Sequence, residues 1–207
     1  MTTAVNRTLD RASCAAWAAL AALALASCGG GGDRASQPAS SAAATKADVT
    51  TLTRGNGPEP DTLDPQRART DGAFNILRDV FEGLTAVGPD GGAVPAAATS
   101  WTVTADGLEY TFQLRDGLKW SNGDRLVAGD YVAGMRRLVD PATASPYAQI
   151  LEPVVNAAAI TRGEKPASEL GVTAPDDRTV VIRLRNPAPY LLGLLAQPGT
   201  FPVHGPS

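Results

Sequence analysis

The sequence predicts a mixed α/β (α+β) fold, and three stretches carry that prediction. Residues 110–114 alternate apolar and polar side chains, which is the period of two that a half-buried β-strand requires. Residues 179–185 show the same alternation. Between them, residues 131–139 place apolar side chains at the spacing of one helical face. A helix packed against strands follows from these patterns.

Length and composition suit a globular protein and argue against one class of partner. The chain has 207 residues, enough for one or two domains, of which 43% are apolar and 19% charged. Its net charge is −3, so the chain offers no basic field to attract nucleic acid, and no motif resembles a nucleic-acid-binding module. We therefore expect no nucleic-acid partner.

Residues 1–27 are predicted to be a lipoprotein signal peptide. Arg7 and Arg11 precede a short apolar run over residues 14–26, which is shorter than the roughly 20 residues that a membrane-spanning helix needs. The letters LASC that end at Cys28 resemble a bacterial lipobox, so we expect Cys28 to be lipidated. The alternative is a plain signal peptide in which this cysteine is incidental.

The Gly-rich stretch after Cys28 favours the anchored form. Residues 28–47 hold mostly Gly, Ser and Ala and are predicted to be a flexible linker. Cys14 would leave with the signal peptide, and Cys28 would carry lipid. No cysteine would then be left for a disulfide, a zinc site or thiol chemistry.

The folded part is expected to begin with a strand over residues 48–53. Thr70 or Asp71 can cap the helix that follows, because their side-chain oxygens accept hydrogen bonds from the free N–H groups of its first turn. We expect Gly83 at the C′ position of this helix and a short strand over residues 85–87. The apolar stripe of the helix consists of Phe74, Leu77, Val80 and Phe81.

A hairpin and a helix form the centre of the prediction. The strand over residues 110–114 is expected to turn at Asp116-Gly117 and to return through residues 118–120. The helix that follows should end at Asp140-Pro141, because a residue before proline is pushed out of the α region. Its apolar face consists of Tyr131, Val132, Met135, Leu138 and Val139.

The last third of the chain is expected to contain a second hairpin between helical segments. Tyr147 lies at the tip of a loop, and a helical segment is expected around residues 150–160. A hairpin follows over residues 172–185 and a helix over residues 190–196, whereas residues 198–207 show no regular pattern. The buried face of the hairpin is predicted to be Val180, Ile182 and Leu184.

No catalytic or metal-binding constellation is predicted. The one histidine, His204, lies in a Pro/Gly-rich tail and is interpreted as a solvated residue, so a Ser-His-Asp triad has no base. The carboxylates lack the spacing of an EF-hand. The Gly runs at residues 29–32 and 91–92 lack the strand-before, helix-after setting of a phosphate loop. We expect neither an enzyme nor a cofactor.

Two features allow both a binding role and a structural role. Arg67, Arg69 and Asp71 precede the first helix, where they could face a ligand or form a solvated capping turn, and the sequence favours the capping turn. Tyr147 at its loop tip could pack inward, or its hydroxyl could donate to a ligand.

The order of the motifs resembles one protein family from residue 53 to residue 203. The motifs are RDVFEGL at residues 78–84, YTFQLRDGLKWSNGD at 110–124, DPATASPY at 140–147 and NPAPY at 186–190. A long ordered string with few gaps is more specific than a short motif. The chain resembles the bacterial extracellular solute-binding proteins of peptide ABC importers, and among them the periplasmic oligopeptide-binding members.

The resemblance implies a periplasmic binding protein-like fold of two lobes that close around an extended peptide. Residues 48–81 match the first segment of lobe I, residues 82–203 match the middle lobe, and residues 204–207 match the start of the return to lobe I. The chain is less than half as long as a family member, so we expect a truncated form with the start of the first lobe and the middle lobe.

The resemblance also implies binding residues. Tyr147 matches the position of a peptide-contacting tyrosine, and Arg69, Thr70 and Asp71 match a segment that lies along the peptide. Relatives carry an acidic residue where Arg69 stands, which changes the ligand charge expected there. Val127 stands where relatives have a helix-capping threonine, and this should weaken the helix N-terminus by about 1 kcal/mol.

The function implied is that of the substrate-binding component of a peptide ABC importer. Its partners would be short peptides, the permease and ATPase complex, and a membrane that holds the lipid anchor. The protein would be an exported monomer, attached to the cell envelope in the periplasm or at the outer face of the membrane. Nickel, dipeptides or other small ligands are alternatives within the family. A surface-tethered interaction lipoprotein, or a non-functional fragment without peptide binding, is the alternative outside it.

Overall fold

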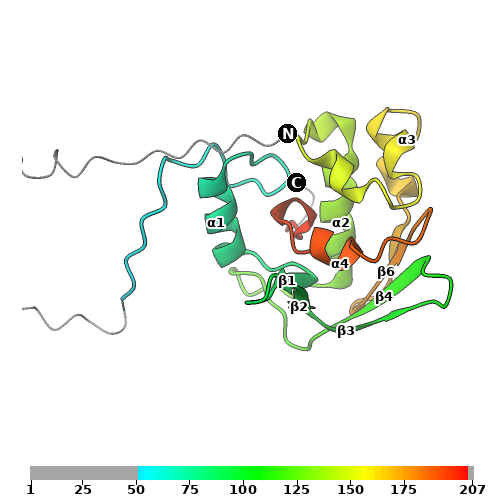
Figure 1. Cartoon of the computed structure of the whole chain (residues 1–207), viewed down its shortest axis with the longest axis horizontal. Helices are drawn as coiled ribbons and strands as arrows, with labels where there is room; N and C mark the ends of the chain where they lie inside the picture. Colours follow the sequence, from blue (N-terminus) through cyan, green and yellow to red (C-terminus); the bar gives the residue numbers. More distant parts are fainter. Residues whose placement is uncertain (1–50, 205–207) are drawn as a thin grey trace, which may run out of the picture. The chain divides into compact units, whose positions relative to one another are not determined.

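The computed structural model describes residues 51–204, and Thr53 to His204 belong to one compact unit (Figure 1). The predicted signal peptide, Cys28, the linker and residues 48–50 of the expected first strand lie outside the described residues. The proposed boundary between the first segment of lobe I and the middle lobe stays a prediction.

A four-stranded antiparallel sheet forms the centre of the unit. Its strand order is β3 (Ala98–Val103), β4 (Glu109–Leu114), β6 (Thr179–Arg183) and β5 (Val172–Asp176). Phe112 pairs with Trp101 on one side and with Val180 on the other, and Tyr110 pairs with Ile182. The helix α2 (Ala128–Val139) packs over one face of this sheet, and within the sheet it contacts mainly β5 and β6 (Figure 1).

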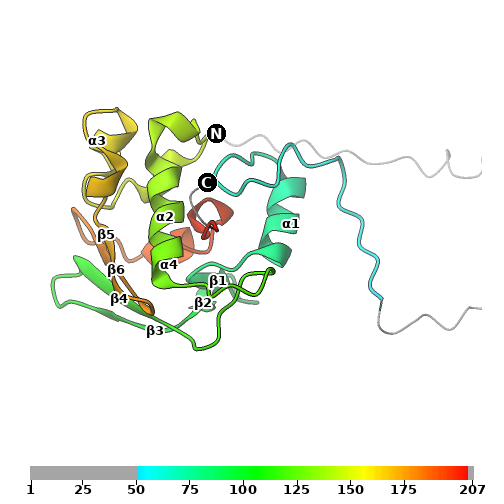
Figure 2. The ribbon, with the colours of Figure 1, turned by 180° about the vertical axis from the view of Figure 1, so that it is seen from behind.

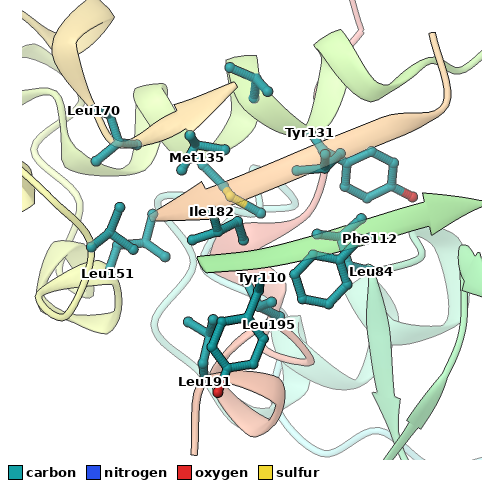
Figure 3. Packing of buried hydrophobic residues seen from close by; sticks show 14 of the residues in the cluster. Leu84, Tyr110, Phe112, Tyr131, Met135, Leu151, Leu170, Ile182, Leu191 and Leu195 are labelled. Carbon is teal, nitrogen blue, oxygen red and sulfur yellow. The ribbon is translucent and has the colours of Figure 1, made fainter. Parts of the chain in front are cut away.

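The core lies between α2 and the sheet, as the periodic patterns predicted. Tyr110, Phe112 and Leu114 are buried, whereas Gln113 between them is exposed. Met135 and Tyr131 of α2 point toward β6 and β4, and Leu191 and Leu195 lie beside Tyr110 (Figure 3). Each such aliphatic side chain contributes about 1.5–3 kcal/mol when fully buried. The residues predicted for the buried faces of the central helix and of the hairpin over residues 172–185 are all buried, namely Tyr131, Val132, Met135, Leu138, Val139, Val180, Ile182 and Leu184.

The prediction of a hairpin at Asp116-Gly117 is wrong. The turn itself exists, since Gly117 has φ +76°. However, β4 pairs with β3 and β6, so both of its edges are occupied and residues 118–120 cannot return along it. The chain runs on instead to a single bridge between Lys119 and Arg125.

A small two-stranded sheet precedes the central one. It consists of β1 (Thr85–Val87), which the sequence predicted, and β2 (Ala93–Pro95), which it did not. The Thr85 hydroxyl donates to the carbonyl of Leu192 at 2.7 Å, which ties this sheet to the short helix α4 (Leu191–Leu194).

The first helix, α1 (Asp71–Val80), begins where it was predicted to begin. The Thr70 hydroxyl accepts a hydrogen bond from the Ala73 N–H at 3.3 Å. Leu77 is buried and Phe74 half-buried, but Val80 is 69% exposed and does not belong to the packed stripe.

The role predicted for Gly83 is also wrong. The helix ends at Phe81 in an extended conformation, and Gly83 has no positive φ. Gly83 is needed for close packing instead. A Cβ there would lie 2.7–2.8 Å from the Leu195 carbonyl, the Phe201 ring and the Thr85 carbonyl, which is closer than real Cβ contacts come.

Two further expectations fail for identifiable reasons. Residues 51–53 form no strand; they are exposed, and neither sheet extends to them. The helix expected around residues 150–160 is two pieces, η2 (Ala148–Leu151) and α3 (Ala157–Thr161), because Pro153 lies between them and cannot donate a helical hydrogen bond. The remaining short 3-10 helices are η1 (Pro141–Thr143), η3 (Ala167–Glu169) and η4 (Pro198–Thr200).

Candidate ligand-binding site

The predicted binding residues lie on two segments that meet at Phe74. The rings of Phe74 and Tyr147 pack against each other with centroids 5.6 Å apart and planes tilted by 59°. Phe74 is one helical turn after Thr70, and its N–H donates to the Thr70 carbonyl at 3.0 Å. The structure therefore brings Tyr147 against Phe74 in the first turn of α1, the helix that Thr70 caps.

Arg69, Thr70 and Asp71 are all exposed at the start of α1. The Arg69 N–H and the Thr70 hydroxyl each donate to the Asp61 carboxylate, both at 3.0 Å. Burial acts to raise the pKa of Asp61, but these hydrogen bonds, with others from the backbone, hold that pKa below its usual value. The capping turn favoured by the sequence is confirmed for Thr70, and the side chains of Arg69 and Asp71 remain on the surface.

Asp61 is a positioning residue that sequence reasoning missed. It precedes its partners by eight and nine residues, so no local capping pattern relates them. An aspartate that binds a backbone N–H and a hydroxyl fixes the turn that carries Arg69 and Thr70.

A second network holds this turn to the core. Arg137 of α2 donates through both terminal nitrogens to the two oxygens of Asp64, each at 2.6 Å, and also to the Gln66 side-chain oxygen at 2.7 Å. Gln66 is 1% exposed, and its amide donates to the carbonyls of Gly199 and Phe201 at 3.1 and 3.0 Å. The hydrogen bonds from Arg137 lower the pKa of Asp64. The segment before α1 is thereby fixed to both α2 and η4.

The Tyr147 loop is shaped by its own local hydrogen bonds. Asp140 caps η1 by accepting from the Ala142 N–H at 2.9 Å, and Ala144 adopts a left-handed conformation with φ +52°. The Ser145 hydroxyl then accepts from the Tyr147 N–H at 3.2 Å. The Tyr147 ring is held in place by these turns, which is what a preorganised ligand contact requires.

His204 is exposed, as the sequence predicted, but it also makes contacts that the sequence did not predict. His204 Nε2 lies 2.8 Å from the Asp124 carboxylate, and its ring meets Trp120 edge-on with centroids 5.2 Å apart. Hydrogen bonds from His204 and Asn122 lower the pKa of Asp124. His204 therefore connects the last described residues to the turn at residues 121–124.

Within residues 51–204, the region of the predicted binding residues combines a half-buried aromatic ring, Tyr147, with exposed charged groups, and no set of metal ligands gathers. Within this part of the chain, no group of three or more His, Cys, Asp or Glu side chains comes together. No helix among these residues is long and apolar enough to cross a bilayer. The chemistry available around Tyr147 and Thr70 is that of hydrogen bonding and ring contact.

Comparison with known proteins identifies the class. The family model described as "Bacterial extracellular solute-binding proteins, family 5 Middle" matches residues 92–206. The chain belongs to this family, which confirms the resemblance inferred from its motifs.

The relatives include proteins with different named ligands. The periplasmic oligopeptide-binding protein OppA of Escherichia coli K12 is 43% identical over 164 residues, or 78% of this chain and 30% of OppA. The probable deoxycholate-binding periplasmic protein YgiS of the same organism is 45% identical over 150 residues, or 72% of this chain and 28% of YgiS.

A solved relative confirms the periplasmic binding protein-like fold class. The crystal structure of Haemophilus influenzae OppA in complex with RPPGFSPFR matches with a TM-score of 0.69 and 43% identity, over 72% of this chain and 29% of that chain. The chain thus spans less than a third of the length of each of these three relatives.

Proposed function

We propose that this chain is part of the substrate-binding component of a peptide ABC importer and contacts an extended peptide. The observation that carries the proposal is the similarity to OppA proteins, one of which is solved with a bound peptide. The arrangement of the predicted residues supports it, because the half-buried Tyr147 packs against Phe74, which follows the exposed residues 69–71 within the first turn of α1.

In this proposal the residues have distinct roles. The Tyr147 hydroxyl and the polar groups at the start of α1 hydrogen-bond to the peptide main chain, which is how proteins bind extended peptides with little dependence on sequence. Arg69 brings a positive charge to this wall and favours a negatively charged group on the ligand. Thr70 and Asp71 form the rest of the wall, and a second lobe closes over it.

The cellular setting is proposed from the sequence and the family. The protein is exported and anchored to the cell envelope through lipid on Cys28, and it delivers peptide to a membrane permease and its ATPase. It acts as a monomer, needs no cofactor, and is a binding protein and not an enzyme.

The test is a titration of the protein, as its host produces it, with pools of di- to pentapeptides. The fluorescence of Trp101 and Trp120 or the heat of binding reports occupancy. Saturable binding of peptides supports the proposal. If no peptide pool binds, the proposal fails.

A second candidate ligand is deoxycholate, because YgiS is named as its probable binder and is 45% identical to this chain. A parallel titration with deoxycholate distinguishes the two, since only the true ligand class saturates at low concentration. A stable, folded protein that binds neither would favour the surface-tethered interaction lipoprotein instead.

A further inference from the structure

A hollow of about 480 Å³ lies at the opposite end of α1 from Thr70. It is formed by the C-terminal end of α1 and the loop between β4 and α2, which Figure 2 shows passing close to that end of the helix. Its volume lies within the range of about 300–1,000 Å³ that is usual for small-molecule sites.

Apolar side chains supply about half of the wall of this hollow. Val80, Phe81, Leu118, Trp120 and Leu126 line it. Val80 is 69% exposed at its rim. Large apolar side chains left open around a concave surface are a common mark of a binding site.

The aromatic wall is fixed before any ligand arrives. The Trp120 indole N–H donates to the Asp130 carboxylate at 3.1 Å, and His204 packs edge-on against the Trp120 ring. Asp130 in turn accepts from the Val127 N–H at 2.9 Å. Trp120 therefore cannot fold into the hollow without breaking these contacts.

The charges around the hollow leave one cation uncompensated. Glu82 and Arg115 both line it, but they neutralise each other through two hydrogen bonds of 2.6 Å. Lys119 also lines it, and within residues 51–204 no carboxylate lies in ion-pair range of its ammonium group. The lining thus combines apolar walls with a single net positive charge.

A second hollow of about 400 Å³, between η2 and α3, lacks this combination. Its two charged lining residues are already paired, Arg162 with Glu164 at 2.7 Å and Glu152 with Arg185 at 2.8 Å. Lys119 differs from these residues in having no ion-pair partner within residues 51–204, and it also lines a smaller adjoining hollow of about 240 Å³.

We propose that the hollow beside α1 is a second ligand site, which binds a small amphipathic carboxylate. The carboxylate pairs with Lys119, and the apolar tail lies against Trp120, Phe81 and Leu126. A free fatty acid or an apolar amino acid with a blocked amino group can supply this chemistry. The site is separate from the proposed peptide wall, because the ten residues of α1 place it about 15 Å from Thr70.

The test uses Trp120 as the reporter. In a Trp101→Phe variant, Trp120 is the one tryptophan left outside the predicted signal peptide. This variant is titrated with octanoate, with N-acetyl-leucine, and with octylammonium and octan-1-ol as probes of equal tail length without the carboxylate. Calorimetry on the unmodified chain repeats the measurement without relying on fluorescence.

We expect octanoate to change the Trp120 fluorescence saturably and to bind about tenfold or more tightly than octylammonium, because only the anion pairs with Lys119. Tighter binding of N-acetyl-leucine than of octanoate would indicate a site for blocked amino acids, and the reverse would indicate a site for fatty acids. Lys119→Glu and Val80→Glu should each weaken octanoate binding about tenfold or more through charge repulsion. The matched surface controls Lys165→Glu and Val103→Glu lie outside the hollow and should bind as the parent does.

Three results would overturn the proposal. They are equal binding of octanoate and octylammonium, unchanged octanoate affinity in Lys119→Glu, and no saturable heat or fluorescence change. A fourth result, competition between octanoate and a bound peptide, would overturn it as well, because it would show one site instead of two. If the protein binds no peptide, octanoate should still bind in the hollow and change the Trp120 fluorescence. The two proposals can therefore fail independently.

Discussion

Gly134 of α2 lies directly against the backbone of Phe201, and a Cβ at Gly134 would overlap the Phe201 carbonyl oxygen. The Phe201 carbonyl also accepts a hydrogen bond from Gln66 at 3.0 Å. The segment at η4 therefore passes between α2 and the residues that precede α1. Its close contact with α2 requires a residue without a Cβ at position 134.

Gly134→Ala should destabilise the protein by about 1–3 kcal/mol, because the added methyl forces α2 and the Phe201 backbone apart. The change is measured as a lower midpoint in urea unfolding. Gly129→Ala on the same helix is the matched control, since its Cβ would meet Val127 alone, at 3.9 Å. That variant should be neutral or gain up to about 1 kcal/mol from helix propensity. Equal unfolding midpoints for the two variants would contradict the close approach.

Arg137→Ala should cost about 1–3 kcal/mol of unfolding free energy, because the Asp64 carboxylate loses its charged partner and keeps only the Gln66 N–H at 3.0 Å, and the Gln66 side-chain oxygen loses its donor. Both side chains of the Arg137–Asp64 pair are only 24% exposed, so solvent screens the pair weakly. The exposed pair of Arg162 and Glu164 is the control, and Arg162→Ala should leave stability nearly unchanged because solvent screens this pair. A loss of unfolding free energy in Arg162→Ala as large as that in Arg137→Ala would contradict this prediction.

The same pair predicts a pH dependence. Arg137 lowers the pKa of Asp64 in the folded state. The ionised Asp64 therefore contributes fully to the stability of the fold above its unfolded pKa of about 3.9, and this contribution is lost as the pH falls through the folded pKa. The stability difference between the unmodified protein and Asp64→Asn should therefore be largest near neutral pH and shrink at acidic pH. Unfolding measured across this range checks the sign, and a difference that grows on acidification would be inconsistent with it.

Val127→Thr should stabilise the protein by about 1 kcal/mol. Val127 is the N-cap of α2 and makes no side-chain cap hydrogen bond, although Asp130 already accepts from the Val127 N–H at 2.9 Å. A threonine hydroxyl supplies the missing acceptor for the first turn, with nearly the same shape. Thermal unfolding compared with Val127→Ala measures the gain, and no difference between Thr and Ala would show that the cap does not form.

Local patterns predicted the elements whose signal lies within one segment. The apolar spacing of α2 and the alternation of β4 and β6 identified their buried faces, and the capping position was predicted as Thr70 or Asp71, of which the structure shows Thr70. The strand β3 was missed because its residues are mostly exposed, and it is a strand through its pairing with β4. The pairing of β4 with β6 likewise joins residues about 70 positions apart, which no local pattern reports.

The site shows the same division between local and distant information. The capping role of Thr70 could be predicted, but the contact between Tyr147 and Phe74 joins two segments that no sequence motif relates. The support from Asp61 and from the Arg137–Asp64 pair depends on the folded backbone. Sequence motifs identified the family, and the structure shows how the predicted wall is held.

The most direct test of peptide binding is a calorimetric titration of the protein, as its host produces it, with the peptide pool that binds best. Tyr147→Ala should weaken binding about tenfold or more, since removing an aromatic contact typically costs more than about 1.4 kcal/mol. Tyr190→Ala is the matched control, because Tyr190 is 61% exposed at the start of α4 and should not affect affinity. Unchanged affinity in Tyr147→Ala, or no binding by the unmodified protein, would contradict the proposed peptide wall.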